Sequence, residues 1–371
     1  MKTTTFLCVR DTDYLFRPFN DRKLTLNSRI VMAPMNRNLA PDGIPTAEME
    51  VYYRRRAEKD VGLIITDSVS VDDEAAADDT CMPRFFGGAA LRAWKKICRA
   101  VHATDCKIIP QLSHAGMMRP LTGDLPNPDV LPIGPSGINP LSLKHTCEPM
   151  SRRRIADVCD SFARAAAMAR LLGFDGVEIQ GGEGYLIDQF LWSETNKRRD
   201  EYGGDIVGRT RFACEVIHAV RKSVGRQFPV IFRFSQWKTG NPAARLVESP
   251  HELSELLMTL CEAGVDMFDC AESLHAEPAF PGNALSLAAW VRLLTQKKVI
   301  CGGGSHDFRT HTEMHPRAMI QHMVRLLQSK EVDLVAVGQS LLADAAWAEK
   351  IRYARESEII PFTLRTLSRL Y

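Results

Sequence analysis

Short apolar runs alternate with longer amphipathic segments along the whole chain. The short runs are rich in Val, Ile, Leu and Met and carry few polar residues, which is typical of parallel strands buried on both faces. The longer segments repeat apolar positions every three to four residues, which predicts helices. The predicted strands cover residues 30–33, 62–66, 107–111, 176–179, 230–234, 267–270, 299–301 and 334–337, and the clearest helices cover 155–172, 209–224, 250–263 and 316–328.

Several helix-to-strand junctions share one sequence pattern. An acidic residue or a glycine ends the helix and an apolar strand follows at once, as in DVGLIIT (60–66), GFDGVEI (173–179), GVDMFDC (264–270) and EVDLVAV (331–337). Eight strands, each followed by a helix, predict a parallel (β/α)8 barrel, the TIM barrel, of the α/β class. A doubly wound open sheet is the alternative, but it normally carries a GxGxxG turn after its first strand, and residues 30–34 have none.

Two long segments interrupt this repeat. Residues 112–153, rich in Pro and Gly, follow the third strand, and residues 180–208 follow the fourth. Long connections after barrel strands lie at the carboxyl-terminal face, where active sites of this architecture are built. We expect a single domain over residues 1–371, with the barrel at about 27–352 and a C-terminal tail at 353–371.

Composition and charge exclude several classes of function. A net charge of +2 gives no electrostatic reason to expect nucleic acid or a membrane surface as a partner. Ten cysteines without any CxxC predict reduced thiols rather than disulfides, a zinc site or an iron–sulfur centre. No apolar stretch approaches a membrane span or a signal peptide core. We expect a cytoplasmic protein without a metal, whose partner is a small-molecule substrate; assembly into a homo-oligomer stays open.

The stretch GFDGVEIQGGEGYLIDQFLWSETNKRRDEYGG at 173–204 carries the most chemical information. A short strand runs into a glycine-rich turn that holds Gln180, Glu183 and Tyr185, and a charge-dense segment follows. The stretch closely resembles the signature of the old yellow enzyme family, which are FMN-dependent ene-reductases built on a TIM barrel. In that signature the turn normally reads HGAHGYL or HSANGYL. Tyr185 is therefore kept, whereas Gln180 and Glu183 replace the usual His and His or Asn.

Other segments are similar to the same family over residues 14–352. The clearest are NSRIVMAPMNR (27–37), IIPQLSHAG (108–116) and PVIFRFSQW (229–237). The resemblance implies a flavoprotein oxidoreductase that transfers hydride between NADPH or NADH, FMN and a small organic substrate such as an activated alkene. No separate dinucleotide-binding fold is visible, so the nicotinamide cofactor would be a transient reductant.

Arg233 lies on a predicted strand that should be buried. Alternation places Ile231, Arg233 and Ser235 on one face and Phe232 and Phe234 on the other. A buried guanidinium needs an anion or a strong acceptor, and the residues alone leave open an ion pair with a neighbouring Asp or Glu. The resemblance implies instead that Arg233 faces N1 and O2 of the flavin and stabilises the negative charge of the reduced ring.

The resemblance implies further FMN contacts. Gln111 would bind the pyrimidine edge through an amide that both donates and accepts, and Asn36 occupies the position, usually Thr or Cys, that bonds the flavin O4. On the phosphate loops after the last two strands, Gln339 replaces an Arg, a loss on the order of 1.5–3 kcal/mol if nothing compensates it. The other expected cofactor-binding residues are Ala33, Pro34, Met35, Ser68, Gly303, Gly304 and Gly338.

The resemblance makes Tyr185 the proton donor to the alkene α-carbon, and Gln180 and Glu183 the pair that holds the substrate oxygen. Gln180 can donate a hydrogen bond, but an ionised Glu183 only accepts and would repel a developing enolate. By position, Arg37, Trp192, Trp237 and Lys238 would line the substrate pocket. His114 and His145, in the long segment after the third strand, could also touch substrate.

Three alternatives therefore stay open for Glu183. A neutral Glu183 would preserve ene reduction. An ionised one would accept from a hydroxyl or amine on another substrate, or pair with a cation. In the third alternative the site has lost ordinary turnover. The corresponding functions are an FMN-dependent oxidoreductase on activated alkenes, an FMN-dependent dehydrogenase or isomerase on a hydroxyl- or amine-bearing substrate, or a flavin-binding protein without redox turnover.

Overall fold

Eight parallel strands close into one barrel in the computed structural model, which describes residues 11–272, 278–303, 316–368 and 370. The strands follow one another in chain order around the barrel, and β10 pairs with β3 to close it. The predicted (β/α)8 architecture is confirmed, and the open-sheet alternative is wrong. The strands are β3 (Ile30–Met32), β4 (Leu63–Ser70), β5 (Lys107–Ser113), β6 (Val177–Gln180), β7 (Val230–Phe234), β8 (Met267–Cys270), β9 (Lys298–Gly302) and β10 (Leu334–Val337).

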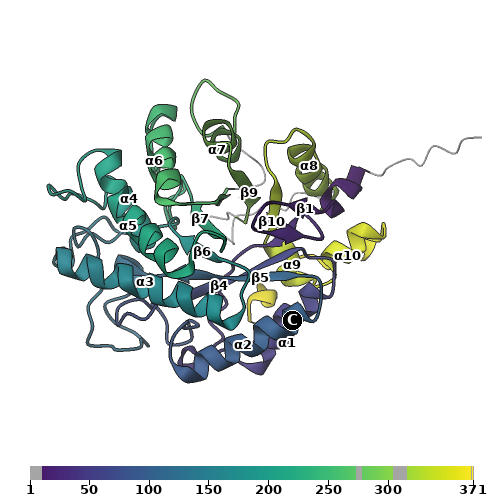
Figure 1. Ribbon diagram of the computed structural model, residues 1–371, viewed down its shortest axis with the longest axis horizontal. Helices are drawn as coiled ribbons and strands as arrows, with labels where there is room; N and C mark the ends of the chain where they lie inside the picture. Colours follow the sequence, from purple (N-terminus) through teal and green to yellow (C-terminus); the bar gives the residue numbers. More distant parts are fainter. Residues whose placement is uncertain (1–10, 273–277, 304–315, 369, 371) are drawn as a thin grey trace, which may run out of the picture.

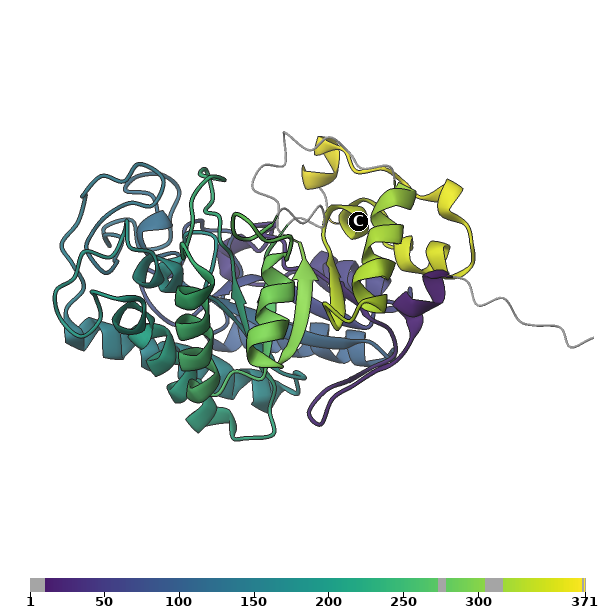
Figure 2. The same ribbon diagram turned by 90° about the horizontal axis from the view of Figure 1, so that it is seen from above.

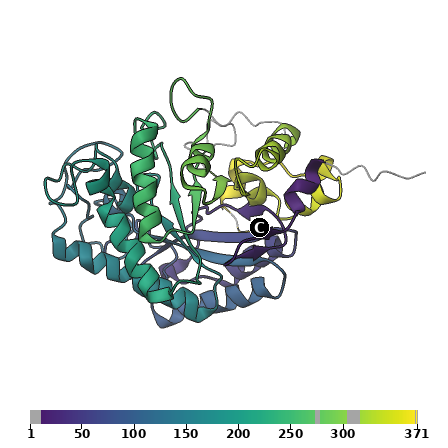
Figure 3. The same ribbon diagram turned by 45° about the horizontal axis from the view of Figure 1, so that its top comes forward.

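A ring of helices covers the outside of the barrel (Figure 1). Helix α3 packs against α5, and α5 packs against α6, as Figure 3 shows. Helices α3, α5 and α6 begin after Ser151, Asp205 and Ser249, whose side chains accept from an amide in the first turn, a cap worth about 1 kcal/mol each. The helices are α1 (Ala47–Ala57), α2 (Gly88–His102), α3 (Arg152–Leu172), α4 (Leu186–Leu191), α5 (Ile206–Val224), α6 (Pro250–Ala263), α7 (Leu287–Thr295), α8 (Pro316–Gln328), α9 (Gln339–Ala343) and α10 (Trp347–Arg352).

The barrel interior is apolar toward the N-terminal ends of the strands, and a hairpin closes that end. Inward side chains such as Ile231 and Ile300 form a cluster separate from the one between barrel and helices. Strands β1 (Phe19–Asn20) and β2 (Thr25–Leu26), which the periodicity did not predict, pair antiparallel. Their apolar residues join the inner cluster beside the first residues of β4, β8 and β10, so the hairpin closes the N-terminal end. Figure 2 shows the hairpin (purple) on the side opposite the long segment after β5 (blue).

Toward the carboxyl-terminal ends of the strands, the inward positions that follow the apolar ones are polar. We call Ser68, Gln111, Glu178, Arg233 and Asp269 the polar belt. Strand register places Ser68 beside Gln111, Gln111 beside Glu178, and Arg233 beside Asp269. All five side chains are buried. Their height in the barrel follows from strand pairing, and it puts them under the carboxyl-terminal face where the long segments lie.

Two strands show how belt residues come to face inward. On β7, Ile231 belongs to the inner cluster and the two phenylalanines belong to the outer one, which confirms the predicted alternation and turns Arg233 inward. Strand β4 shifts register between Ile65 and Ser68, a bulge-like irregularity that alternation alone does not predict.

Among the helices of the described residues, none is both long and apolar enough to cross a membrane.

His102, the last residue of α2, ties that helix to the barrel. Its Nε2 lies 2.7 Å from Asp175 Oδ2, and the same oxygen accepts from the Ile108 amide at 2.9 Å. The hydrogen bond with Asp175 raises the pKa of His102 from 6.5 to about 10. Because the folded state holds the proton more tightly than the unfolded chain, this stabilisation is complete below pH 6.5 and is lost as the pH rises through about 10.

We predict that His102→Gln lowers the free energy of unfolding by about 1 kcal/mol at pH 6. The difference from the unsubstituted protein should shrink toward zero above pH 10, because neutral His102 no longer forms a charged pair. Urea denaturation across this pH range measures it. A difference independent of pH would contradict the charged pair.

Candidate active site

The glycine-rich turn after β6 lies directly against the end of β7. Gly181 and Gly182 leave no room for a side chain, because a Cβ atom would lie 2.3 Å from the Phe232 ring and 2.9 Å from the Ser235 nitrogen. The Glu183 amide donates to Ser235 Oγ at 2.9 Å. Glu183 itself has φ +63°, in the left-handed region that non-glycine residues seldom adopt. The close approach carries Glu183 over the carboxyl-terminal end of the barrel, beside β7.

A buried ion pair holds this turn from behind. Lys238 Nζ lies 3.0 Å from Asp188 Oδ1, and both side chains are fully buried. The second carboxylate oxygen of Asp188 accepts from the Gly184 amide at 2.8 Å. Burial raises the pKa of Asp188 to about 6 and lowers the pKa of Lys238, and each partner opposes the shift of the other. The pair therefore joins the turn after β6 to the loop after β7.

Arg233 is the centre of the polar belt. Its Nη1 donates to Asp269 Oδ2 at 2.6 Å, its Nε and Nη2 donate to Glu183 Oε1 at 3.1 and 2.9 Å, and its Nη2 also donates to the Gly303 carbonyl at 3.2 Å. Burial opposes the charge, but Asp269 and Glu183 outweigh it and raise the pKa of Arg233. The ion pair with a neighbouring acid, left open by the sequence, is present, and Glu183 pairs with a cation.

Two belt carboxyl groups meet beside Arg233. Glu178 Oε2 and Asp269 Oδ1 are buried and have no hydrogen-bond partner among the described residues. Burial, and then the charge of Asp269, raise the pKa of Glu178 well above its usual range, and burial raises that of Asp269. Both directions favour a proton on this pair of carboxyl groups. Arg233 itself pairs with Asp269 and Glu183.

Gln111 continues the belt toward β4. Its Nε2 donates to Glu178 Oε1 at 2.8 Å, and its Oε1 accepts from Ser68 Oγ. A carboxamide has two N–H donors and two acceptor lone pairs, so one of each stays available on Gln111. That pattern suits a ligand edge that both donates and accepts.

Tyr185 lies beside Asn36, although the two are far apart in the sequence. Asn36 Nδ2 donates to Tyr185 Oη at 2.8 Å, and Asn36 Oδ1 accepts from the Ser68 amide at 3.2 Å. Burial raises the pKa of Tyr185 well above its usual value, and the charge of Glu183 adds to the shift. The phenol is therefore protonated at neutral pH, and because Asn36 is the donor in their contact, the tyrosine proton is free to point elsewhere.

Gln180 also faces the barrel interior. It is buried, it stands beside Arg233 in the strand register, and its Oε1 accepts from the Gly182 amide at 3.2 Å. The carbonyl oxygen is thus engaged by the turn, which orients the amide group. Gln180, Glu183, Tyr185, Asn36 and the polar belt come together at one end of the barrel.

The expected phosphate loops meet the first barrel strand. Gly303 has φ +66°, and a Cβ atom there would lie 2.6 Å from the Ala33 Cβ. A Cβ on Gly338 would lie 3.5 Å from Met35 Sδ, next to Pro34 in the chain. The amide nitrogen Nε2 of Gln339 is buried without a hydrogen-bond partner among the described residues. Gly304, the other expected contact, lies outside the described residues.

The residues expected to line the substrate pocket are packed by protein neighbours. Arg37 Nη2 donates to the carbonyls of Thr366 and Leu367, in the short helix η5 (Leu364–Ser368). Trp192 is 4% exposed with Lys238 Nζ 5.5 Å from its ring centroid, and the Trp237 indole donates to the Ala271 carbonyl at 2.8 Å. Their contact with substrate stays a prediction.

His114 has a structural role in the long segment after β5. Its Nδ1 accepts from the Gly116 amide at 3.0 Å, so Nε2 carries the proton and lies 3.2 Å from Asp73 Oδ1. The side chain is fully buried. Both ring nitrogens are thus engaged by the protein, and contact of this histidine with substrate stays a prediction.

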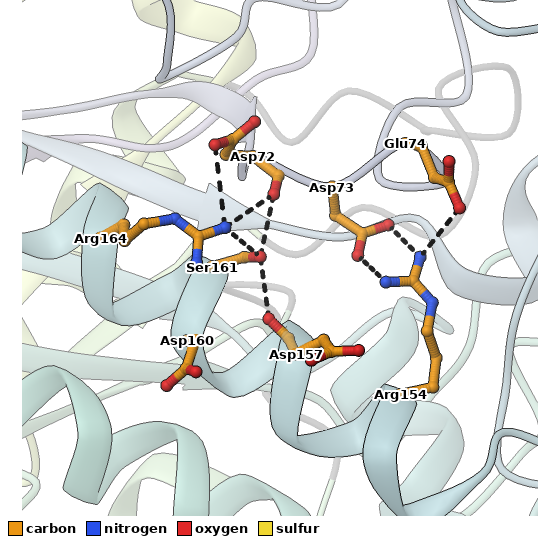
Figure 4. Close-up of a pocket in the computed structure, with 8 residues that line it drawn as sticks. All are labelled: Asp72, Asp73, Glu74, Arg154, Asp157, Asp160, Ser161 and Arg164. Atoms are coloured by element: carbon orange, nitrogen blue, oxygen red, sulfur yellow. Dashed lines mark hydrogen bonds and ion pairs between the residues drawn. The ribbon is translucent and has the colours of Figure 1, made fainter.

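An open pocket of about 380 Å³ lies outside the barrel between the end of β4 and α3 (Figure 4). Arg154 binds both oxygens of Asp73 at 2.5 and 2.7 Å, and Arg164 lies 3.7 Å from Asp72. The two arginines pair with acidic residues that follow β4, and these ion pairs anchor α3, although the lining as a whole holds five acidic side chains against two basic ones. Its lining residues are Asp72, Asp73, Glu74, Arg154, Asp157, Asp160, Ser161 and Arg164.

Three residues of the site escaped the sequence analysis. Glu178 and Asp269 alternate with apolar neighbours in VEIQ and MFDC, in phase with inward positions, and that alternation could have identified them. Asp188, on the short helix α4, carries no such pattern, so nothing in the sequence indicates that Lys238 pairs with it.

The donors and acceptors of the site fit FMN, except that acidic residues of the protein already bind Arg233. Gln111 keeps a free donor and acceptor for a pyrimidine edge, Gly303 allows close approach of backbone, and the orphaned Gln339 amide can meet an anion. Arg233 supplies the expected guanidinium, but Glu183 and Asp269 already bind it.

Comparison with known proteins supports the expected family. The profile of the "NADH:flavin oxidoreductase / NADH oxidase family" matches residues 14–358. An NADH oxidase of Thermoanaerobacter brockii is 31% identical over 91% of this chain, which spans about half the length of that relative. A chanoclavine-I aldehyde reductase of Penicillium roqueforti is 37% identical over 79% of each chain. The structure of morphinone reductase superposes with a TM-score of 0.78 at 25% identity, covering 95% of this chain and 92% of that one.

The buried ion pair behind the turn makes a stability prediction. Lys238→Met leaves Asp188 buried and unpaired, and we expect it to lower the free energy of unfolding by about 3–5 kcal/mol. The double variant Asp188→Asn, Lys238→Met should lose clearly less, because no charge is stranded. Urea denaturation of the single and double variants measures the coupling, and a single-variant loss below about 1 kcal/mol would show that the pair is not effectively buried.

Proposed function

This chain belongs to the NADH:flavin oxidoreductase / NADH oxidase family, and on that premise we propose that it is an FMN-dependent oxidoreductase of the old yellow enzyme type. NADPH or NADH would be the reductant and a small organic molecule, an activated alkene or a related compound, the second substrate. FMN, when bound, supplies the hydride acceptor and donor. The observation that carries the proposal is a protonated, oriented tyrosine, Tyr185, at the open end of a barrel whose inner belt offers Gln111 and Arg233 to a flavin ring.

Tyr185 would deliver the proton of the reaction. A phenol carries its proton at neutral pH, and Asn36 holds the Tyr185 oxygen by donating to it at 2.8 Å. A donor on the tyrosine oxygen also stabilises the tyrosinate left after transfer. Proton donation by a positioned side chain typically contributes a factor of about 10² to 10⁴ in rate.

The substrate oxygen would meet fewer donors here than in the usual signature. Gln180 keeps an amide that can donate, whereas the Glu183 carboxylate is turned to Arg233 and donates nothing. We therefore propose a substrate that needs little polarisation of its carbonyl. The Penicillium relative is named an aldehyde reductase, which favours a small conjugated carbonyl compound over a simple cyclic enone.

A second candidate rests on the acceptor-only character of Glu183. A carboxylate at this position could accept from a hydroxyl or amine, which would suit dehydrogenation of such a substrate. The two candidates differ in which molecule reduces the flavin. An alcohol or amine that bleaches the FMN-loaded protein without NADPH or NADH would favour dehydrogenation.

Tyr185→Phe tests the proton donor. We predict that anaerobic NADPH or NADH bleaches the visible flavin absorbance of both the unsubstituted protein and the variant. Reoxidation by an activated alkene should slow at least about 100-fold in the variant, because only that step needs the phenol proton. Stopped-flow absorbance separates the two steps. Failure of both nicotinamides to bleach the unsubstituted protein would exclude the reductase proposal, and equal reoxidation rates would exclude the role of Tyr185.

Gln339→Arg tests the phosphate site. We predict about tenfold tighter FMN binding, because a guanidinium adds a charge-assisted contact that the orphaned amide lacks. Riboflavin, which has no phosphate, should bind both proteins equally. A fluorescence titration of the apoprotein with each flavin measures this, and equal gains for both flavins would place Gln339 away from the phosphate.

A further inference from the structure

We propose that Glu183 is an internal competitor for the flavin ring, because its carboxylate holds the edge of Arg233 that the ring edge needs. The inference rests on the proposed FMN site and adds a determinant of cofactor affinity that belongs to this chain. It concerns binding of the oxidised cofactor and needs no turnover.

Glu183 binds Arg233 in the way that an acceptor atom of a bound ligand would bind it. One oxygen of Glu183 receives both Nε–H and Nη2–H of Arg233, at 3.1 and 2.9 Å. Nη1 is held on its other side by Asp269 at 2.6 Å, and the Gly303 carbonyl receives a further bond from Nη2 at 3.2 Å. Both Nη2 protons and the Nε proton are thus engaged, so a flavin edge that accepts from the Nε and Nη2 side of Arg233 must displace an existing acceptor.

Of the acceptors around Arg233, Glu183 is the one able to leave. Asp269 lies on β8 with its side chain fully buried, whereas the side chain of Glu183 retains 20% exposure. Glu183 has a route to water, so its displacement costs affinity without excluding the flavin.

The backbone keeps Glu183 close after displacement. Its amide donates to Ser235 Oγ at 2.9 Å, its carbonyl accepts from the Thr239 amide at 3.3 Å, and its φ is +63°. Only the side chain can move, so the carboxylate stays near the cation and continues to compete. The other charged groups nearby, Lys238 and Asp188, are paired with each other.

Glu183→Gln is the sharpest test, because it removes the charge and keeps the shape and the backbone conformation. We expect the apoprotein of this variant to bind FMN at least about tenfold more tightly than the unsubstituted protein, since a neutral amide holds a guanidinium less strongly than a carboxylate does. The affinity for riboflavin should increase by the same factor, because Glu183 competes with the flavin ring and not with the phosphate. Fluorescence titrations measure both, and thermal melting with added FMN gives an independent readout through its larger shift in the variant.

Two further variants complete the experiment. Glu183→Asn tolerates the left-handed backbone better and should show the same gain, which keeps the test usable if the Gln variant folds poorly. Glu194→Gln is the matched control, because Glu194 lies on the same connection, is exposed and pairs only with Lys197 at 3.4 Å among the described contacts. It should leave both affinities unchanged.

The proposal is overturned if Glu183→Gln binds FMN with unchanged or weaker affinity, if the gain is matched by Glu194→Gln, or if FMN gains while riboflavin does not. The last result would mean repulsion of the phosphate. The titrations contain no NADPH or NADH, so they still test Glu183 even if the protein proves unable to transfer hydride. Conversely, a protein that bleaches with NADPH but shows no effect of Glu183→Gln retains the proposed function and loses only this inference.

Discussion

A charged guanidinium inside a closed barrel needs acceptors, and the arrangement of this site follows from that requirement. Arg233 faces inward because β7 alternates, and barrel closure removes it from water. Its charge is tolerable only with anionic partners, which are Asp269 on the adjacent strand and Glu183 on the turn after β6. Burial and the charge of Asp269 raise the pKa of Glu178, the remaining acid of the polar belt.

The turn that carries Glu183 is held by packing and by charge. Gly181 and Gly182 let its backbone touch β7, and the buried pair of Lys238 with Asp188 fastens it from behind. These features position Tyr185 and Glu183 on the same rigid segment. The same scaffold holds both positions. Tyr185 matches the family signature, whereas Glu183 departs from it without changing the residues that hold the turn.

The departure changes what the site offers a substrate and a cofactor. In the family pattern two donors face the substrate oxygen; under our proposal Gln180 is the donor that remains, and Glu183 is directed to Arg233. Under our proposals one acidic residue affects both sides of the flavin site, by removing a donor from the substrate side and adding an acceptor on the ring side. The family assignment rests on residues 14–358 as a whole, so it does not depend on this position.

The sequence by itself determined the barrel, its eight strands and the inward direction of Arg233, because hydrophobic periodicity is a local property that each segment carries alone. It did not reveal the hairpin of β1 and β2, the irregularity in β4, or the pairing of Lys238 with Asp188. It also left open which acid meets Arg233. Glu183 and Asp269 lie 50 and 36 residues away from it in the chain. Strand register brings Asp269 beside Arg233, and the packed turn after β6 brings Glu183 to the same guanidinium. Only the tertiary structure therefore decided that Glu183 occupies the cation expected for the flavin.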